Sequence, residues 1–289
     1  MTENANTQPH DQTHSNEKTI LLIGGTGKAG RRVADRLTAI GRPVRIGSRS
    51  ADPAFDWDDP GTWSGALDGI DAVYVTYYPD LAAPGSADAI RAFADQAVAS
   101  GIRQLVLLSG RGEPEALRCE EIVQRYPVDW TIVRSSMFSQ NFDEYFLLDA
   151  VRSGVVAFPA GDTPEAFIDV DDIADVVTAA LTEDGHSGEV YEVTGPRLLT
   201  FDQAVGEIAA AAGREIRYVP ITAEEYAAGA AEEGVPAEFA TFLGELFGTI
   251  FDGRNVYVAD GVQRALGRPP RDFSDYVRRA ASTGVWSAS

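Results

Sequence analysis

Short apolar runs alternate with helical patterns along the first half of the chain. The runs lie at residues 19–23, 43–46, 54–57, 71–76, 104–108 and 129–134. Between them, apolar residues recur at the spacing of a helix with one buried face, most clearly at 87–100. Strands that alternate with helices in this way build a parallel sheet with helices on both faces. The pattern therefore predicts an α/β fold with a Rossmann-type doubly wound parallel sheet.

The alternation becomes less regular beyond about residue 140. Helices are predicted at 139–152, 172–182 and 201–212, strands at 189–193 and 215–219, and further helices between 222 and 283. The predicted N-cap of the helix at 172–182 is Asp171. Because no obvious linker divides the chain, we expect residues 18–155 to form a dinucleotide-binding core. Residues 156–289 would return to that core and add a smaller C-terminal α+β lobe that binds the substrate.

Residues 1–17 are polar and are predicted to form a disordered tail. They lack the apolar segment of a signal peptide, and no apolar run reaches the roughly 18 residues of a membrane span. His10 and His14 stand four residues apart, but two histidines on a flexible tail do not make a metal site. No metal is expected.

The composition narrows the range of partners. The formal net charge is −20 at pH 7 and the pI is near 4.4, which argues against nucleic acid or an anionic membrane as a partner. The single cysteine, Cys119, cannot form an internal disulfide and lies in a helical pattern, which favours a buried thiol in a reducing compartment. We therefore expect a cytoplasmic protein, a monomer or homodimer, that binds a small-molecule substrate.

One glycine cluster has the context of a nucleotide site. An apolar run ends at Ile23, and the glycines follow directly before a helical pattern. Such glycines allow a tight turn, a close approach of the backbone to a pyrophosphate, and close packing of helix on strand. The helix N-terminus then offers free N–H groups to the phosphates. The residues expected to hold the cofactor here are Gly24, Gly25, Thr26, Gly27, Lys28, Ala29 and Gly30.

The end of the next apolar run indicates which cofactor binds. An NAD enzyme usually places Asp or Glu there, to bond the ribose 2′-hydroxyl. This chain has Ser48 and Arg49 and no acid before Asp52, and a guanidinium beside a hydroxyl suits a 2′-phosphate. NADP(H) is thus favoured over NAD(H), although a solvated arginine at a loop start would give the same pattern. Asp56 and Trp57 would lie near the adenine, unless Trp57 only caps the core.

The other strand ends complete the predicted site. In open parallel sheets the ligand binds at the carboxyl ends of the strands. Beyond the glycine cluster and the segment 48–49, those ends are Thr76, Tyr77, Tyr78, Ser109, Gly110, Arg111 and the segment 135–141. The topology alone therefore assigns these residues to the site.

Several local motifs point to one family. They are IGGTGKAG (23–30), Ser48-Arg49, WTIVRSSMFSQNF (130–142), FIDVDDIADV (167–176) and YEVTGPRLLTF (191–201). On these motifs the chain resembles the NmrA-like atypical short-chain dehydrogenase/reductases over about residues 19–286. It looks most like the ergot-alkaloid agroclavine and festuclavine dehydrogenases and their bacterial relatives. The local features shared with them are IGSRS (46–50), FDW (55–57), VLLS (106–109) and GPRLLT (195–200).

The resemblance implies where the ligands lie. NADP(H) would extend over the glycine turn, Arg49, Tyr77, Tyr78, Ser109 and Gly110. The loop 137–141 would close on the nicotinamide, with Phe138 against the cofactor. The residues expected to contact the substrate are Arg111, Met137, Asn141, Phe142 and Tyr145. The family motif at 167–176 contains Asp169, for which we expect a structural role.

A missing lysine limits the chemistry. Orthodox members of the superfamily use Tyr-x-x-x-Lys, in which the lysine lowers the tyrosine pKa so that the phenol can protonate a carbonyl. Here no lysine follows Lys28, so that motif cannot exist. One explanation is hydride transfer to an iminium ion, a quinone or an enone, which needs no strong acid, with Tyr78 or Tyr145 as a weak proton donor. The alternative is a non-catalytic, NADP(H)-sensing regulatory protein of the NmrA type.

Overall fold

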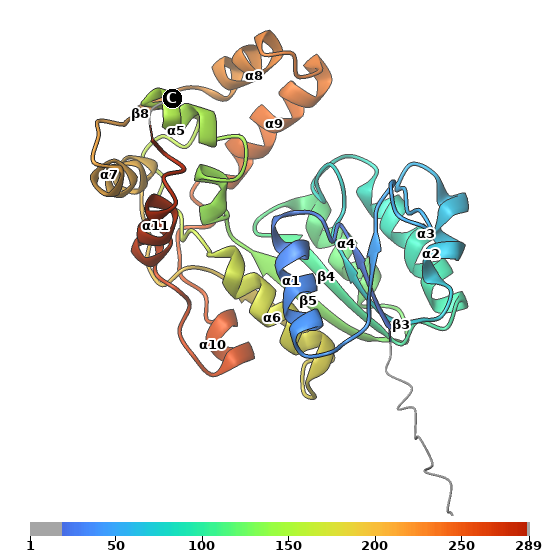
Figure 1. Cartoon of the computed structure of the whole chain (residues 1–289). Helices are drawn as coiled ribbons and strands as arrows, with labels where there is room; N and C mark the ends of the chain where they lie inside the picture. Colours follow the sequence, from blue (N-terminus) through green and yellow to red (C-terminus); the bar gives the residue numbers. More distant parts are fainter. Residues whose placement is uncertain (1–18, 288–289) are drawn as a thin grey trace, which may run out of the picture.

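The computed structural model describes residues 19–287 (Figure 1). The predicted disordered tail, with His10 and His14, lies outside the described residues. Figure 1 shows a sheet-centred core beside a mostly helical lobe. Within residues 19–287, every helix is too short or too polar to cross a membrane.

The core is built on six parallel strands in the order β2-β1-β3-β4-β5-β7. They are β1 (Thr19–Ile23), β2 (Val44–Gly47), β3 (Ile70–Val75), β4 (Gln104–Gly110), β5 (Asp129–Ser135) and β7 (Glu189–Val193). The chain goes from β1 to β2 on one side and then to β3 on the other. This reversal is the place where open α/β sheets bind their ligands.

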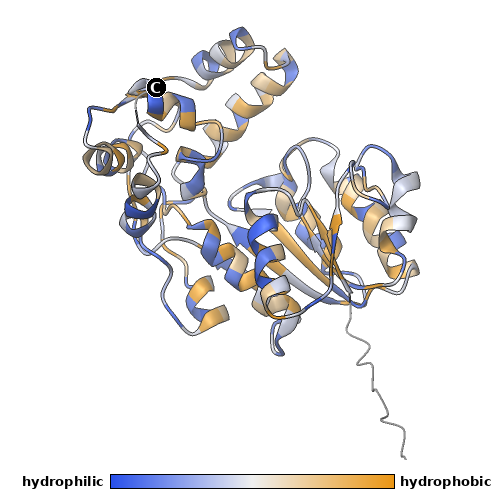
Figure 2. Ribbon diagram, viewed as in Figure 1, coloured by the Kyte–Doolittle hydropathy of each residue, from blue (hydrophilic) through white to orange (hydrophobic). Residues whose placement is uncertain are grey.

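Helices cover both faces of the sheet. One face carries α1 (Lys28–Ala39) and α6 (Val170–Thr182), and the other α2 (Trp63–Leu67), α3 (Ser86–Ala99) and α4 (Pro114–Val123). Along β1, Ile20 and Leu22 pack toward α1 and α6, whereas Leu21 and Ile23 pack toward the other layer. Strands buried on both faces are apolar throughout, and Figure 2 shows them in orange between the helices. This arrangement confirms the predicted Rossmann-type α/β fold.

The lobe has its own apolar core. Its elements are α5 (Leu148–Ser153), β6 (Val155–Phe158), α7 (Phe201–Ala212), β8 (Arg217–Pro220), α8 (Ala223–Glu232), α9 (Ala237–Ile250) and α11 (Phe273–Ser282). Strands β6 and β8 form a small parallel sheet. The centre is aromatic: the Phe158 and Phe201 rings stack with centroids 4.6 Å apart. Helix α10 (Gly261–Leu266) returns to the core, where it packs against α6 and β7.

The strand predicted at 54–57 does not join the sheet. Its only pairing is a bridge between Asp56 and Asp59, because the chain turns there instead of extending. The Asp56 carboxylate accepts a hydrogen bond from the N–H of Asp58 at 3.1 Å, which stabilises the turn. The aromatic side chains that suggested a strand, Phe55 and Trp57, pack into the core beneath α2 and α3.

The helix predicted at 139–152 is also interrupted. The structure has a short 3₁₀ helix, η2 (Ser139–Phe142), and then α5, which begins at Leu148. The carbonyl of Phe142 accepts the indole N–H of Trp286 at 2.9 Å instead of an N–H of a next helical turn. This partner is 144 residues away and has no local signal in the sequence.

The N-cap of α6 is Asp169 and not Asp171 as predicted. The Asp169 carboxylate accepts from the N–H of Asp171 at 2.9 Å, and the helix begins at Val170. Asp171 lies in the first turn, where a carboxylate is also favourable.

Candidate active site

The turn between β1 and α1 needs glycine at two positions to form. Gly24 has φ = +75°, and a Cβ there would overlap the Thr76 hydroxyl. At Gly30 a Cβ would overlap the carbonyl oxygen of Gly24, so α1 packs this closely only with glycine there. These glycines shape the turn itself.

Gly27 leaves room for a ligand. It is exposed, its φ is −75°, and the atom nearest to an added Cβ is the Gly24 carbonyl oxygen at 3.3 Å. Gly27 is the N-cap of α1, no side chain caps the helix, and the first turn holds no acid. The first N–H groups of α1 therefore meet no competing side chain, which fits the pyrophosphate of a dinucleotide.

Lys28 joins the glycine turn to the loop after β5. Its ammonium donates to Asn141 Oδ1 at 2.6 Å and lies 4.3 Å from the centre of the Tyr145 ring. Burial lowers the pKa of Lys28 to about 8, while Glu144 and Asp143 oppose that shift. A phosphate at this place would favour the ammonium form, so the side chain fits a cofactor-binding role.

The loop after β5 is held across the start of α1. Glu144 forms ion pairs with Arg31 and with Arg32, the latter at 2.6 Å. Phe138 is half-buried, and the ammonium of Lys28 lies 5.8 Å from its ring centre. Met137 is half-buried beside it. Of the loop residues that the sequence assigned to the site, Phe138, Asn141 and Tyr145 are thus brought to Lys28 of the glycine turn, whereas Met137 packs against the core of the lobe.

Arg49 follows the carboxyl end of β2. Arg49 is exposed, and its guanidinium makes no hydrogen bond or ion pair with any residue from 19 to 287. Arg45, on the same strand, is occupied by the backbone carbonyls of Ala66 and Asp68 at 2.8 and 2.6 Å. Ser48 Oγ lies 3.3 Å from Ser50 Oγ. A free cation beside a hydroxyl therefore stands where a 2′-phosphate is expected.

Trp57 and Tyr77 close the space between the ends of β2 and β3. Their ring centroids are 4.9 Å apart, and the Trp57 indole donates to the carbonyl of Thr76 at 3.2 Å. Trp57 also packs on the buried core below it, so it caps the core and borders the expected adenine position. The Asp56 carboxylate is used in its own turn, by the N–H of Asp58.

Exposed aromatic rings stand near the ends of the central strands. The exposed fractions are 69% for Tyr78, 64% for Tyr145, 37% for Phe146 and 47% for Tyr257. Tyr78 follows β3, the Tyr145–Phe146 pair follows β5, and Tyr257 lies on the guanidinium of Arg111, which follows β4. Tyr145 and Phe146 form an adjacent exposed pair, and aromatic faces of this kind suit flat organic molecules.

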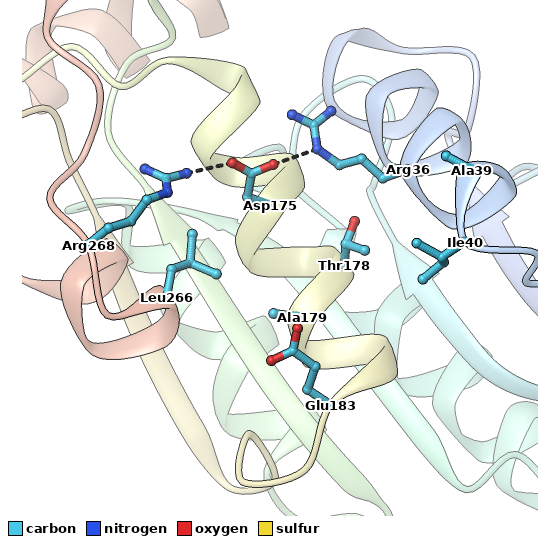
Figure 3. Close-up of a pocket in the computed structure, with 9 residues that line it drawn as sticks. All are labelled: Arg36, Ala39, Ile40, Asp175, Thr178, Ala179, Glu183, Leu266 and Arg268. Atoms are coloured by element: carbon cyan, nitrogen blue, oxygen red, sulfur yellow. Dashed lines mark hydrogen bonds and ion pairs between the residues drawn. The ribbon is translucent and has the colours of Figure 1, made fainter.

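A hollow of about 450 Å³ lies away from these residues. Figure 3 shows it between α1, α6 and α10, where Asp175 bridges Arg36 at 2.6 Å and Arg268 at 2.5 Å. Its lining includes Ala39, at the end of α1, and Glu183, just after α6. It is therefore at the opposite end of these helices from the glycine turn, and we assign it to packing between helices.

A family model of NAD(P)H-binding proteins matches residues 24–184, from the glycine turn to just past α6. Agroclavine dehydrogenase of Claviceps fusiformis is 30% identical over 286 residues, which are 93% of this chain and 98% of that protein. The chain belongs to the NAD(P)H-binding family, as an NmrA-like atypical short-chain dehydrogenase/reductase. The oxidoreductase YesF of Bacillus subtilis is 31% identical over 284 residues, 94% of this chain and 98% of YesF.

Solved structures share the fold. An NADPH-dependent quinone oxidoreductase from Escherichia coli, in complex with NADPH, superposes with a TM-score of 0.72 at 21% identity, covering 90% of this chain and 99% of that one. NmrA, a negative transcriptional regulator in complex with NAD, gives 0.69 at 14% identity, covering 93% and 97%. The predicted family is confirmed, and the protein is an NAD(P)H-dependent oxidoreductase.

Two residues predicted to contact the substrate of this reductase lie elsewhere. Arg111 has a side chain 2% exposed, with Nε 2.9 Å from Glu192 Oε1 and Nη1 3.6 Å from Glu165 Oε1. Phe142 is fully buried in the aromatic core of the lobe, with its ring centroid 5.6 Å from that of Phe167. Long-range partners hold both side chains, so the sequence-based assignment is corrected for these two.

Ser109 is turned away from the cofactor side. Its hydroxyl donates to Glu120 Oε1 at 2.6 Å, beneath α4, and Arg134 donates to the same carboxylate oxygen at 3.0 Å. The hydroxyl is thereby occupied, and of Ser109 only the backbone is left for a ligand. Cys119 is fully buried nearby, as predicted, and burial raises the pKa of its thiol to about 11.

Glu113, which the sequence analysis did not assign to the site, lies at the carboxyl end of β4. Glu113 is the N-cap of α4, yet its carboxylate makes no capping hydrogen bond. Instead, the carboxylate occupies the space that a side chain at Gly110 would fill. The signal in the sequence was an acid three residues beyond the glycine that ends an apolar run, directly before Pro114.

Proposed function

We propose that the protein is an NADPH-dependent reductase that transfers hydride to a flat or cyclic organic substrate, such as an iminium ion, a quinone or an enone. One observation carries this proposal. Lys28, in the first turn of the uncapped helix α1, places its ammonium against the exposed ring of Tyr145, so a phosphate site and an aromatic surface lie side by side. The similarity to the agroclavine dehydrogenase of Claviceps fusiformis supports a cyclic substrate.

Each part of the site would have its own role. The first turn of α1 and Lys28 would bind the pyrophosphate, and the loop 137–145 would exclude water from the reacting atoms. The bound dihydronicotinamide would supply the hydride. Tyr78 and Tyr145 would pack on the face of a flat substrate, and each is exposed enough to meet solvent.

Arg49 supports NADP(H) over NAD(H), because its guanidinium is free to bind a 2′-phosphate. We expect Arg49→Asp to weaken NADPH binding by more than tenfold, in line with loss of a charged hydrogen bond of about 1.5–3 kcal/mol, and to leave NADH binding nearly unchanged. Fluorescence titration with both cofactors measures this. Arg103→Asp, the same charge change at an exposed position before β4, is the control. Equal NADPH affinity in the two variants would contradict the assignment.

The reaction itself is tested by mixing the protein with NADPH and a panel of cyclic iminium ions, quinones and enones. Substrate-dependent loss of NADPH absorbance with at least one class is the expected result. Tight NADPH binding without turnover of any class would contradict the proposal and favour a cofactor-sensing protein.

A further inference from the structure

Glu113 is a largely buried residue whose carboxyl group meets no hydrogen-bonding partner in the described part of the chain. It is 8% exposed, and its carboxylate makes no hydrogen bond or ion pair with the described residues, 19–287. Most of the side chain is enclosed, but neither carboxyl oxygen is sealed from solvent, so the group can exchange a proton with water. Since the side chain stands at the N-cap of α4 without capping it, the requirements of the helix do not explain where the carboxylate lies.

The carboxyl is placed at the carboxyl end of β4. It fills the position of the missing Gly110 side chain, and Gly110 is the last residue of β4, opposite Ser135 at the end of β5. The sheet order reverses between β1 and β3. A dinucleotide that crosses this reversal has one half toward β2, where Arg49 stands, and the other half toward β3 and β4. Glu113 is therefore on the side of the nicotinamide.

The surroundings of Glu113 favour the neutral form of its carboxyl group. Burial raises the pKa of Glu113 well above its ordinary value, and the carboxyls of Asp80, in the loop after β3, and Glu120, on α4, add to the rise. Two arginines of β5 and of the β4–α4 loop are paired with other groups. Arg134 pairs with Glu120, and Arg111 is directed to other carboxylates.

Arg254 also approaches the β4–α4 loop, but it does not neutralise Glu113. It donates to the carbonyl of Gly112 at 2.9 Å and pairs with Asp252 at 2.7 Å. Within the described chain, Glu113 thus faces two carboxyls and no free cation. This setting shifts the carboxyl group toward its protonated form, in which it can donate a proton.

We infer that Glu113 is the proton donor of the reductase, in place of the Tyr-x-x-x-Lys pair that the chain lacks. For an enone, hydride adds to the β-carbon and the π electrons move to the carbonyl oxygen. The O–H bond of Glu113 breaks, and its proton passes to that oxygen, which gives an enol and then the saturated ketone. The carboxylate left behind regains a proton from water. This inference rests on the proposed function, and it adds a catalytic residue to it.

Comparing two classes of substrate distinguishes a proton-donating role of Glu113 from a structural one. An iminium ion becomes a neutral amine on hydride addition and needs no proton, whereas an enone needs one. We expect Glu113→Gln to lower the turnover of a cyclic enone by about 100-fold or more, and to leave NADPH affinity and the turnover of a cyclic iminium ion unchanged. Glu121→Gln, an exposed acid on the same helix, should leave both turnovers unchanged.

The pH profile gives a second distinction. Because the donor must be protonated, enone turnover by the wild type should fall as the pH rises through the pKa of Glu113. The iminium reaction should lack this limb, and so should the residual enone reaction of Glu113→Gln. Equal enone turnover in the wild type and Glu113→Gln would overturn the inference and leave the proposed reductase standing. Wild-type turnover of iminium ions alone would do the same.

A measurement without cofactor or substrate tests the protonation state directly. The infrared spectrum of the wild type at pH 7 should contain a protonated-carboxyl band that is absent from Glu113→Gln and present in Glu121→Gln. An ionised Glu113 at pH 7 would overturn the inference. If the wild type turned over no substrate of any class, both the proposed function and this inference would be contradicted.

Discussion

At the scale of single residues, the glycine turn separates positions that build the fold from one that leaves space for the cofactor. We expect Gly27→Val to abolish NADPH binding without unfolding the protein. Its φ of −75° is accessible to valine, its Cβ would have its nearest neighbour at 3.3 Å, and the branched side chain would stand where the phosphates bind. NADPH fluorescence titration and thermal unfolding measure the two effects.

Gly30→Val is the matched comparison. Its Cβ would overlap the carbonyl oxygen of Gly24, so α1 would have to move away from β1. We expect this variant to lose stability or fail to fold, as overpacking at backbone contacts does. Retained NADPH binding in Gly27→Val would mean that the pyrophosphate lies elsewhere.

The amine of Lys28 predicts how cofactor affinity depends on pH. Its pKa is about 8 without ligand, and the negative phosphates would raise it, so the complex holds more protons than the free protein above that pH. By linkage, NADPH affinity should fall as the pH rises above about 8. Lys28→Arg, which stays charged, should flatten this dependence. A pH-independent affinity in the wild type would show that the ammonium does not contact the phosphates.

At the scale of elements, Asp169 connects three segments around the site. Its carboxylate accepts from Gln140 of η2 at 2.8 Å, caps α6, and pairs with Arg279 of α11. Asp169 is 1% exposed, so its bonds to Gln140 and to the N–H of Asp171 are largely shielded from water, whereas the side chain of Arg279 is half exposed. One side chain thus fixes the start of α6, the loop over the glycine turn and a helix of the lobe.

We expect Asp169→Ala to lower the free energy of unfolding by about 2 kcal/mol, from the lost cap and the buried donors left unpaired. Asp171→Ala, at the cap position that the sequence favoured, should cost about 1 kcal/mol or less because its ion pairs are part-exposed. Urea titration measures both. Faster proteolysis within 137–147 in Asp169→Ala would show the loosened loop. An equal cost for the two variants would contradict the assignment of the cap.

At the scale of the whole molecule, the sequence predicts what depends on local periodicity and misses what depends on distant partners. The six-stranded sheet and the glycine turn follow from short runs whose neighbours in sequence are also neighbours in space. The break after Phe142 depends on Trp286, and the placement of Arg111 depends on Glu165 and Glu192. Glu113 was missed because the sequence places it as the acid before Pro114, typical of a helix start, and gives no sign that its carboxyl lies over Gly110 instead.

Arg111 is also where the core and the lobe segment 252–258 meet, and its replacement tests their connection. Its guanidinium donates to the carbonyls of Asn255 and Tyr257 at 3.0 and 2.9 Å, between Glu165 and Glu192. Arg111→Met would leave the buried carboxylate of Glu165 without its cation, whereas Glu192 would keep its ion pair with Arg134, so we expect the free energy of unfolding to fall by about 3 kcal/mol. Arg254→Met, with a part-exposed ion pair, should cost about 1 kcal/mol or less.

The pH dependence of this loss follows from Glu165. Burial raises the pKa of Glu165 to about 7, and Arg111 opposes that rise. Without the arginine the pKa would rise further, so the folded state would bind a proton that the unfolded state releases, over a window that extends above pH 7. The stability of Arg111→Met should therefore keep falling as the pH rises past 7, relative to the wild type. Urea unfolding at several pH values measures it. If Arg111→Met were as stable as the wild type but had lost turnover, Arg111 would contact the substrate, as the sequence suggested.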